Sequence, residues 1–403
     1  MKISERAQKV EPFYAMDFAR RASELTAAGR RVVTLSLGEP DFGAPPLVRE
    51  AMRAMMDGRP LTYTPARGLP ELRGDIANFY RERHGVTIDP DRIVVTSGAS
   101  SALLLVLAAT TDPGDEVIMA DPSYPCNRQL VETFGGRALM VPTTATSRLQ
   151  LDDAAVAQAW SSRTSAVMIA TPSNPTGTSI PFEELEAICT RARDHGAWRI
   201  VDEIYLYLSD PAEDGTPPRS VLEVDPDAIV INSFSKYFGM TGWRLGWAIL
   251  PEVLVSVAER LATNYFLCAS TPAQLAARAA FDPASLAVCD ERRRELVERR
   301  AFVLDGLNRL GLPVTVLPNG AFYAYFDVSA TGMDSWTFCE RALEVAGVSL
   351  TPGRDFGPAT SDTHVRLSYA SSREELAEGL SRLGDFVRSE LSLGLEADAS
   401  ASS

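Results

Sequence analysis

The chain has 403 residues and a formal net charge of −14, from 39 Lys and Arg against 53 Asp and Glu. Its hydrophobic fraction of 45% and charged fraction of 23% are typical of a globular protein that buries a large core without disulfides or a structural metal. The acidic balance argues against nucleic acid or an anionic membrane surface as the main partner, because both attract basic proteins.

The five cysteines lie singly along the sequence, with no CxxC pair and no Cys/His cluster. We therefore expect neither a disulfide framework nor a metal site, and a reducing cytoplasmic location. The segment before Tyr14 lacks an apolar stretch of signal-peptide length. The longest apolar run, within Ser101–Ala109, is too short to span a membrane.

Short apolar runs alternate with amphipathic stretches through the middle of the chain. An N-terminal helix is predicted over 17–28, and further helices over 99–109 and 181–195. Strands separated by helices indicate βαβ units, and therefore an α/β fold with a mostly parallel sheet flanked by helices. The strands are predicted over 92–96, 116–120, 165–170, 198–202, 228–231 and 247–250.

From about residue 282 the pattern changes to that of a smaller α+β domain. A charged helix over 290–310 precedes strands predicted over 313–316, 320–326, 346–350 and 365–369. We expect an N-terminal arm and helix at 1–45 that packs on the small domain, a large domain at 46–285, the small domain at 286–390 and a disordered tail at 391–403.

Polar residues follow the ends of several predicted strands. Ser97, Asn174, Asp202 and Lys236 each come at or just after a strand. Because ligands of open α/β sheets bind at the carboxyl ends of the strands, these side chains indicate one common site.

Lys236 lies in the most informative segment, with Ser233 and Ser235 before it and Arg244 after it. A lysine that loses hydration has a lowered pKa and attacks carbonyls, while serines and an arginine fork suit a phosphate. Together they indicate an aldehyde cofactor that carries a phosphate. The alternative is a solvated loop lysine.

The other candidates each have a plainer alternative. Ala99 and Ser100 follow Gly98 at a strand-to-helix junction, which suits an anion but also a simple helix cap. Asp202 ends an apolar strand and would balance a protonated pyridine nitrogen, or else pair with an arginine or cap a helix.

Asn174 and Tyr205 could donate to a ring hydroxyl, although Asn174 also suits a plain turn. Tyr124 could stack on a planar ring or lie exposed in a loop. Arg366 alternates with apolar neighbours and could clamp a carboxylate, or be a surface charge on an edge strand.

Ten motifs in order resemble the class I/II group of fold-type I, pyridoxal-phosphate-dependent aminotransferases. The resemblance extends from about Phe13 to Leu383. The motifs are SLGEPDF, YTPARGLPELR, VTSGAS, DPSYP, PSNPTGT, VDEIY, SFSKYFGMTGWRLGW, GAFY, TPGRDFG and VRLSYA.

The resemblance implies a role for each matching residue. Lys236 would be the Schiff-base lysine that also moves the proton, Asp202 would pair with the pyridine nitrogen, and Asn174 and Tyr205 would hold the ring hydroxyl. Tyr124 would stack on the ring. The phosphate would be held by Ala99, Ser100, Ser233, Ser235 and Arg244, with Tyr63 from the neighbouring subunit of a homodimer, and the substrate carboxylate by Gly38, Asn174 and Arg366.

The resemblance also implies a ping-pong transfer of an amino group between an L-amino acid and a 2-oxo acid. The apolar segment Phe13–Met16 favours a neutral, small or aromatic side chain on the substrate. Arg354 departs from the family, which usually has a small or apolar residue there, and is either a binder of a distal carboxylate or a surface charge. Two alternatives keep the cofactor: a carbon–sulfur β-lyase and a non-catalytic pyridoxal-phosphate sensor. The acidic charge argues against the sensor.

Overall fold

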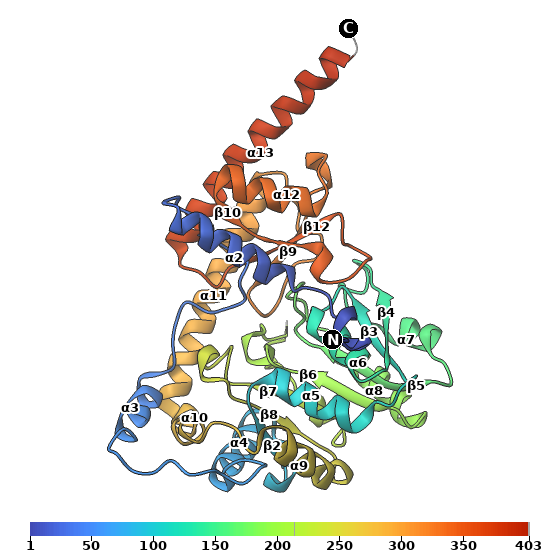
Figure 1. Ribbon diagram of the computed structural model, residues 1–403, viewed down its shortest axis with the longest axis vertical. Helices are drawn as coiled ribbons and strands as arrows, with labels where there is room; N and C mark the ends of the chain where they lie inside the picture. Colours follow the sequence, from blue (N-terminus) through green and yellow to red (C-terminus); the bar gives the residue numbers. More distant parts are fainter. Residues whose placement is uncertain (213, 402–403) are drawn as a thin grey trace.

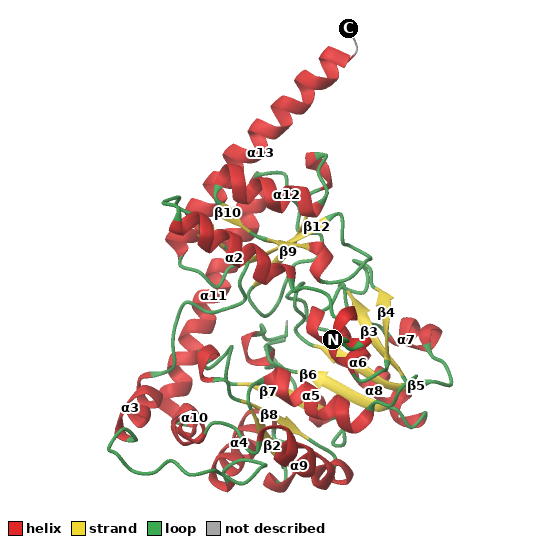
Figure 2. Cartoon of the chain, viewed as in Figure 1, coloured by secondary structure: helices red, strands yellow, loops and turns green. Residues whose placement is uncertain are grey.

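The computed structural model describes residues 1–212 and 214–401, which form two lobes of unequal size (Figure 1). The larger lobe is built on a seven-stranded sheet and the smaller on short strands, and helices surround both (Figure 2). Helix α11 (Pro283–Arg309) runs from one lobe to the other. None of the helices within these described residues combines the length and apolar content needed to cross a membrane.

The large sheet confirms the predicted α/β fold. Its strand order is β2-β8-β7-β6-β5-β3-β4, and every neighbouring pair is parallel except those that β8 makes with β2 and β7. The strands are β2 (Ile93–Thr96), β3 (Glu116–Asp121), β4 (Arg137–Pro142), β5 (Thr164–Ala170), β6 (Trp198–Asp202), β7 (Ile229–Ser233) and β8 (Gly246–Ile249).

Helices cover both faces of this sheet, which explains its continuous apolar strands. Consecutive residues of one strand, such as Ile200 and Val201 of β6, belong to different core clusters on opposite faces of the sheet. One cluster includes α5 (Ala99–Thr110), α6 (Pro125–Thr133) and α9 (Glu252–Phe266). The other includes α4 (Pro70–His84) and α8 (Phe182–Asp194). Helix α7 (Asp153–Ala159) packs against α8.

The small lobe holds an antiparallel sheet in the order β11-β12-β9 and a parallel pair of β1 with β10. Helix α2 (Tyr14–Ala27) contacts β10 and β11, as predicted for the N-terminal helix. The strands are β1 (Val33–Thr34), β9 (Tyr323–Asp327), β10 (Val348–Ser349), β11 (Thr351–Pro352) and β12 (His364–Ser368), and the remaining helices are α1 (Glu5–Lys9), α3 (Pro46–Ala54), α10 (Thr271–Ala277), α12 (Ser335–Arg341) and α13 (Arg373–Ala401).

Four predictions differ from the structure. The strand expected over 313–316 is not formed: the segment contacts β9 through the backbone bond that the N–H of Asp327 donates to the carbonyl oxygen of Pro313, and no ladder follows. Of the strand expected over 346–350, only Val348–Ser349 forms, as β10, because Ala346 still belongs to a helical turn and Gly347 has a left-handed φ of 65°. Helix α11 starts earlier than 290, because Asp282 caps it through the N–H of Ala284.

The fourth difference concerns the chain end. The backbone of 391–401 continues α13 where the sequence predicts a disordered tail over 391–403; alanine, leucine and glutamate there are good helix formers. Residues 402 and 403 lie outside the described part. The domain division at 45, 285 and 390 stays a prediction.

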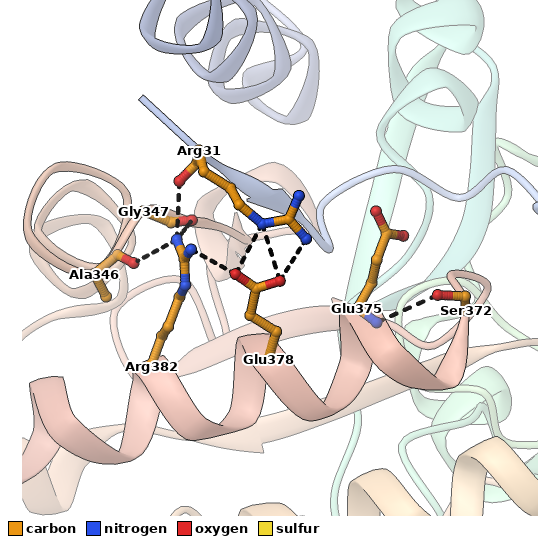
Figure 3. A network of polar contacts seen from close by, with 7 residues as sticks. All are labelled: Arg31, Ala346, Gly347, Ser372, Glu375, Glu378 and Arg382. Carbon is orange, nitrogen blue, oxygen red and sulfur yellow. Dashed lines mark hydrogen bonds and ion pairs between the residues drawn. The ribbon is translucent and has the colours of Figure 1, made fainter. Parts of the chain in front are cut away.

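A polar network joins α13 to the segment before β1 (Figure 3). Arg31 donates to both carboxylate oxygens of Glu378, at 2.9 and 3.0 Å from its Nε. Arg382 donates to Glu378 and to the carbonyl oxygens of Arg31 and Ala346. Gly347 has φ of 65°, and a Cβ there would lie 2.9 Å from the Arg31 carbonyl oxygen. The network therefore requires glycine at 347.

Candidate active site

The carboxyl edge of the large sheet gathers the predicted polar residues. Asp202 is the last residue of β6, Asn174 follows β5, and Lys236 follows β7. Ala170 and Asp202 are register partners, so these strand ends lie side by side. Because β8 runs opposite to β7 and β2, Arg244 just before β8 reaches the same edge as Gly98 just after β2.

A cavity of about 410 Å³ opens at this edge. Of the predicted site residues, all but Tyr63 line it: Gly38, Ala99, Ser100, Tyr124, Asn174, Asp202, Tyr205, Ser233, Ser235, Lys236, Arg244 and Arg366. Ser97, also noted at a strand end, does not line it, whereas the two residues that begin α5 do.

Lys236 is partly buried, and its Nζ donates to the carbonyl oxygen of Gly38 at 2.6 Å. Burial lowers its pKa to about 8, because the charged amine loses hydration. Arg366 and Arg244 lower this pKa further, while Glu39 and Asp202 act in the opposite direction. A lysine in this state is a nucleophile toward an aldehyde at moderate pH.

Asp202 is 6% exposed and accepts one hydrogen bond, from the N–H of Ile204 at 3.0 Å. Burial raises its pKa to about 6. In the described part of the chain it forms no ion pair with an arginine or lysine, so the arginine-pair alternative is wrong there. A buried carboxylate facing a cavity without a cationic partner suits a protonated ring nitrogen.

The start of α5 forms an anion cradle. Its N-cap residue is Gly98, and no side chain caps its first N–H groups, which therefore stay available to a ligand. A Cβ on Gly98, at φ of 88°, would lie 2.6 Å from Nη2 of Arg244. Ser233 and Ser235 line the same end of the cavity. These donors fit the phosphate of pyridoxal phosphate, with Lys236 and Asp202 placed for its aldehyde and ring nitrogen.

Arg366 lies at the substrate end of the cavity, on the central strand of the small sheet, and is 2% exposed. The surface-charge alternative is therefore wrong. Its Nη1 donates to Oδ1 of Asn174 at 2.8 Å, so Asn174 is more than a turn residue. Its buried Nε has no acceptor among the described residues. A fixed guanidinium with a spare buried donor suits a carboxylate.

Tyr323 is a site residue to which the sequence assigned no role, although it ends the GAFY motif. Its ring lies 4.5 Å from the Arg366 guanidinium, and its hydroxyl lies 2.7 Å from that of Tyr205. A Cβ on Gly38 would collide with this hydroxyl, at 2.0 Å. Tyr323 therefore joins the carboxylate end of the cavity to the ring-binding end.

Three other side chains complete the comparison with the sequence. Tyr124 is half-buried and lines the cavity, with its ring edge-on to Phe13 at 5.9 Å. Tyr63 is 78% exposed and lies away from this cavity. Arg354 is exposed and stands over the ring of Trp336 at 5.0 Å rather than in the cavity.

The comparisons with known proteins agree on one family. Residues 30–383 match the family model described as aminotransferase class I and II. A valine–pyruvate aminotransferase of Mycobacterium tuberculosis is 39% identical, over 94% of this chain and 97% of that protein. An aspartate/prephenate aminotransferase of Thermus thermophilus is 36% identical over the same shares, 94% and 97%.

Solved structures are similar over nearly the whole chain. An aminotransferase from Mycobacterium tuberculosis has a TM-score of 0.92 at 39% identity, covering 96% of this chain and 100% of that one. The aspartate aminotransferase of Thermus thermophilus with maleate has a TM-score of 0.90 at 35% identity, covering 96% and 99%.

Proposed function

Since the chain belongs to the class I and II aminotransferases, which depend on pyridoxal phosphate, we propose that it moves an amino group from an L-amino acid with an uncharged side chain to a 2-oxo acid, by a ping-pong mechanism. The relatives named above differ in their substrates, so the preference for an uncharged side chain is argued from the cavity of this chain.

The composition of the cavity wall carries this proposal. Its described lining includes three cationic side chains, and each already has an assigned partner. Lys236 is assigned to the cofactor aldehyde, Arg244 to the phosphate and Arg366 to the substrate carboxylate. Among the described residues of this single chain, no fourth cation lines the cavity for a second carboxylate. The remaining wall is largely apolar and contains Phe13, Ala15, Met16, Leu37 and Ile204. Apolar walls favour aliphatic or aromatic side chains over charged ones.

Each residue would act at a stated atom. Arg366 and Asn174 would hold the substrate carboxylate, and Lys236 would take the proton from the substrate Cα and return it at the other end of the reacting system. Asp202 would keep the ring nitrogen protonated, and Tyr205 would donate to the ring oxygen. When bound, pyridoxal phosphate supplies the electron sink that makes this proton removable. The apolar wall would exclude water.

A homodimer is the second part of the proposal. Tyr63 is exposed and does not reach the cavity of its own chain, which supports a role at the phosphate of a neighbouring subunit. Further exposed apolar side chains, Met56, Leu61, Tyr265, Leu267 and Leu275, suit a contact surface. The cytoplasmic location stays a prediction.

An absorption spectrum of the protein with pyridoxal phosphate, recorded before and after addition of single amino acids, tests the function. We expect the band of the lysine-bound cofactor to form and to be converted by valine, leucine or phenylalanine, and not by aspartate. Conversion by aspartate alone contradicts the proposed substrate class. The β-lyase alternative is supported if pyruvate is released from cystathionine without a 2-oxo acid, and the sensor alternative if the band forms but no amino acid converts it.

A further inference from the structure

The start of α2 forms part of the substrate wall. Phe13, Ala15 and Met16 line the cavity although they belong to the N-terminal arm, outside both sheets. Met16 is exposed and Phe13 half-buried, so few contacts of their own side chains fix them. The position of this wall therefore depends on what holds the backbone at 13–16.

Helix α2 has no cap within its own sequence. Its N-cap residue is Phe13, whose side chain cannot accept a hydrogen bond. Asp355, from the small lobe, supplies the missing acceptor. Its Oδ1 accepts from the N–H of Tyr14 at 2.8 Å and its Oδ2 from the N–H of Ala15 at 2.7 Å.

Asp355 is itself firmly placed. It is 1% exposed, and burial raises its pKa to about 6, so the carboxylate is charged near neutral pH. Its negative charge faces the positive end of α2, which favours this arrangement. Both carboxylate oxygens of Asp355 accept a hydrogen bond from the arm, so two bonds hold it.

Arg128 of α6 extends the attachment to the large lobe. Its Nη1 donates to the carbonyl oxygen of Asp355 at 2.9 Å, and its Nη2 donates to Glu11 of the arm at 3.0 Å. The same helix starts after Tyr124, whose ring contacts Phe13. The arm, the small lobe and the ring-stacking residue therefore meet at one point.

We propose that Asp355 is a positioning residue that holds the apolar wall over the substrate side chain and so strengthens the binding of amino acids whose uncharged side chains reach this wall. It acts through the backbone of Tyr14 and Ala15 and lines no part of the cavity. The inference rests on the proposed function for its substrates, but the attachment of the arm can be tested without turnover.

The test compares the holoenzyme with its Asp355→Asn and Asp355→Ala variants. Losing a helix cap lowers the equilibrium constant for the docked position of the arm by a factor of roughly ten. The factor is smaller for asparagine, which keeps one acceptor. We expect KM for leucine and phenylalanine to rise by that factor, with kcat and the KM for alanine nearly unchanged, because the alanine methyl does not reach the wall.

Asp152→Asn is the matched control. Asp152 is also a helix-capping aspartate, but it caps α7 of the large lobe through the N–H of Ala155 at 2.7 Å, and α7 packs against α8. This variant should leave all three KM values unchanged. Glu11→Gln, which removes the charge of the exposed partner of Arg128, should shift the KM for leucine in the same direction by about twofold.

Hydrogen–deuterium exchange of the holoenzyme gives the readout that does not need turnover. The amides of 13–18 should exchange faster in Asp355→Asn than in Asp152→Asn, while the sheet amides stay protected. Equal exchange in the two variants, or a uniform rise of KM that includes alanine, overturns the inference. If no amino acid is converted by the unmodified protein, the proposed function fails, and the exchange comparison still decides the role of Asp355.

Discussion

The amine of Lys236 lies 2.6 Å from the carbonyl oxygen of Gly38, so the end of β7 is joined to the segment that follows β1. The cofactor lysine of the large lobe thus contacts the segment that connects β1 of the small lobe to α3. Because the donor is a lysine whose pKa is lowered by burial, its reactivity depends on pH in a defined way.

We expect attachment of pyridoxal phosphate to the apoprotein to accelerate as pH rises, since only the neutral amine attacks the aldehyde. The rate constant should level off near the lowered pKa of Lys236, about 8, rather than near its usual value of 10.5. Stopped-flow absorbance measures it. Glu39→Gln should move the inflection to lower pH, because Glu39 raises this pKa. An inflection at the usual lysine value contradicts the assignment.

Gly98→Ala should weaken cofactor binding at least about tenfold, because the new methyl group would crowd the Arg244 guanidinium at the anion cradle. Gly114→Ala is the matched control: its φ of 97° is equally unfavourable for alanine, but its Cβ would meet no atom within 4 Å. Both variants should lose similar stability in thermal unfolding. Equilibrium titration with pyridoxal phosphate should separate them, and equal affinities would argue against the cradle.

Arg366→Lys should raise KM for the amino acid and for the 2-oxo acid by about a hundredfold each, since an ammonium cannot keep the bonds to Asn174 and clamp a carboxylate together. The cofactor spectrum should be unchanged. Steady-state kinetics with both substrates check this, and a loss of kcat at constant KM is the result that rejects the clamp.

Arg354→Ala should leave KM unchanged for every substrate, a 2-oxo acid acceptor with a distal carboxylate included, because the guanidinium packs on Trp336 outside the cavity. Its loss should lower stability by about 0.5–1 kcal/mol, the value of an exposed cation–π contact. Kinetics with the dicarboxylic 2-oxo acid decide the matter, since a large increase of its KM would make Arg354 a binder of the distal carboxylate.

Gly347→Ala should destabilise the protein by about 2 kcal/mol more than Gly332→Ala, measured by chemical unfolding. Both glycines have positive φ, of 65° and 72°, but a Cβ at 347 would meet the Arg31 carbonyl and Arg382, whereas one at 332 would meet nothing. Similar losses in the two variants would show that backbone strain alone matters there.

The strands of the large sheet could be predicted because most of them are buried on both faces and are therefore continuously apolar. β4 was missed because it lies at the sheet edge, is half-exposed, starts with Arg137 and ends with Pro142. Asn174, Asp202 and Lys236 followed from the rule that sites form at strand ends. Asp355 could not be found in this way, because its partner Ala15 lies 340 residues away and nothing local marks the pairing.

The antiparallel pairing of β7 with β8 fixes how many residues separate Lys236 from Arg244. Ser233 is opposite Gly246, and Trp247 and Ala248 belong to opposite sides of the sheet. One inserted residue would have to be accommodated in the loop between β7 and β8. If it shifted the register of β8 instead, Trp247 would turn toward the side of the sheet where Ala248 packs, and the space there fits only the alanine. The spacing of the two cofactor residues is thus inherited from strand register, and natural length variation in this segment should be rarer than in the loop at 214–219.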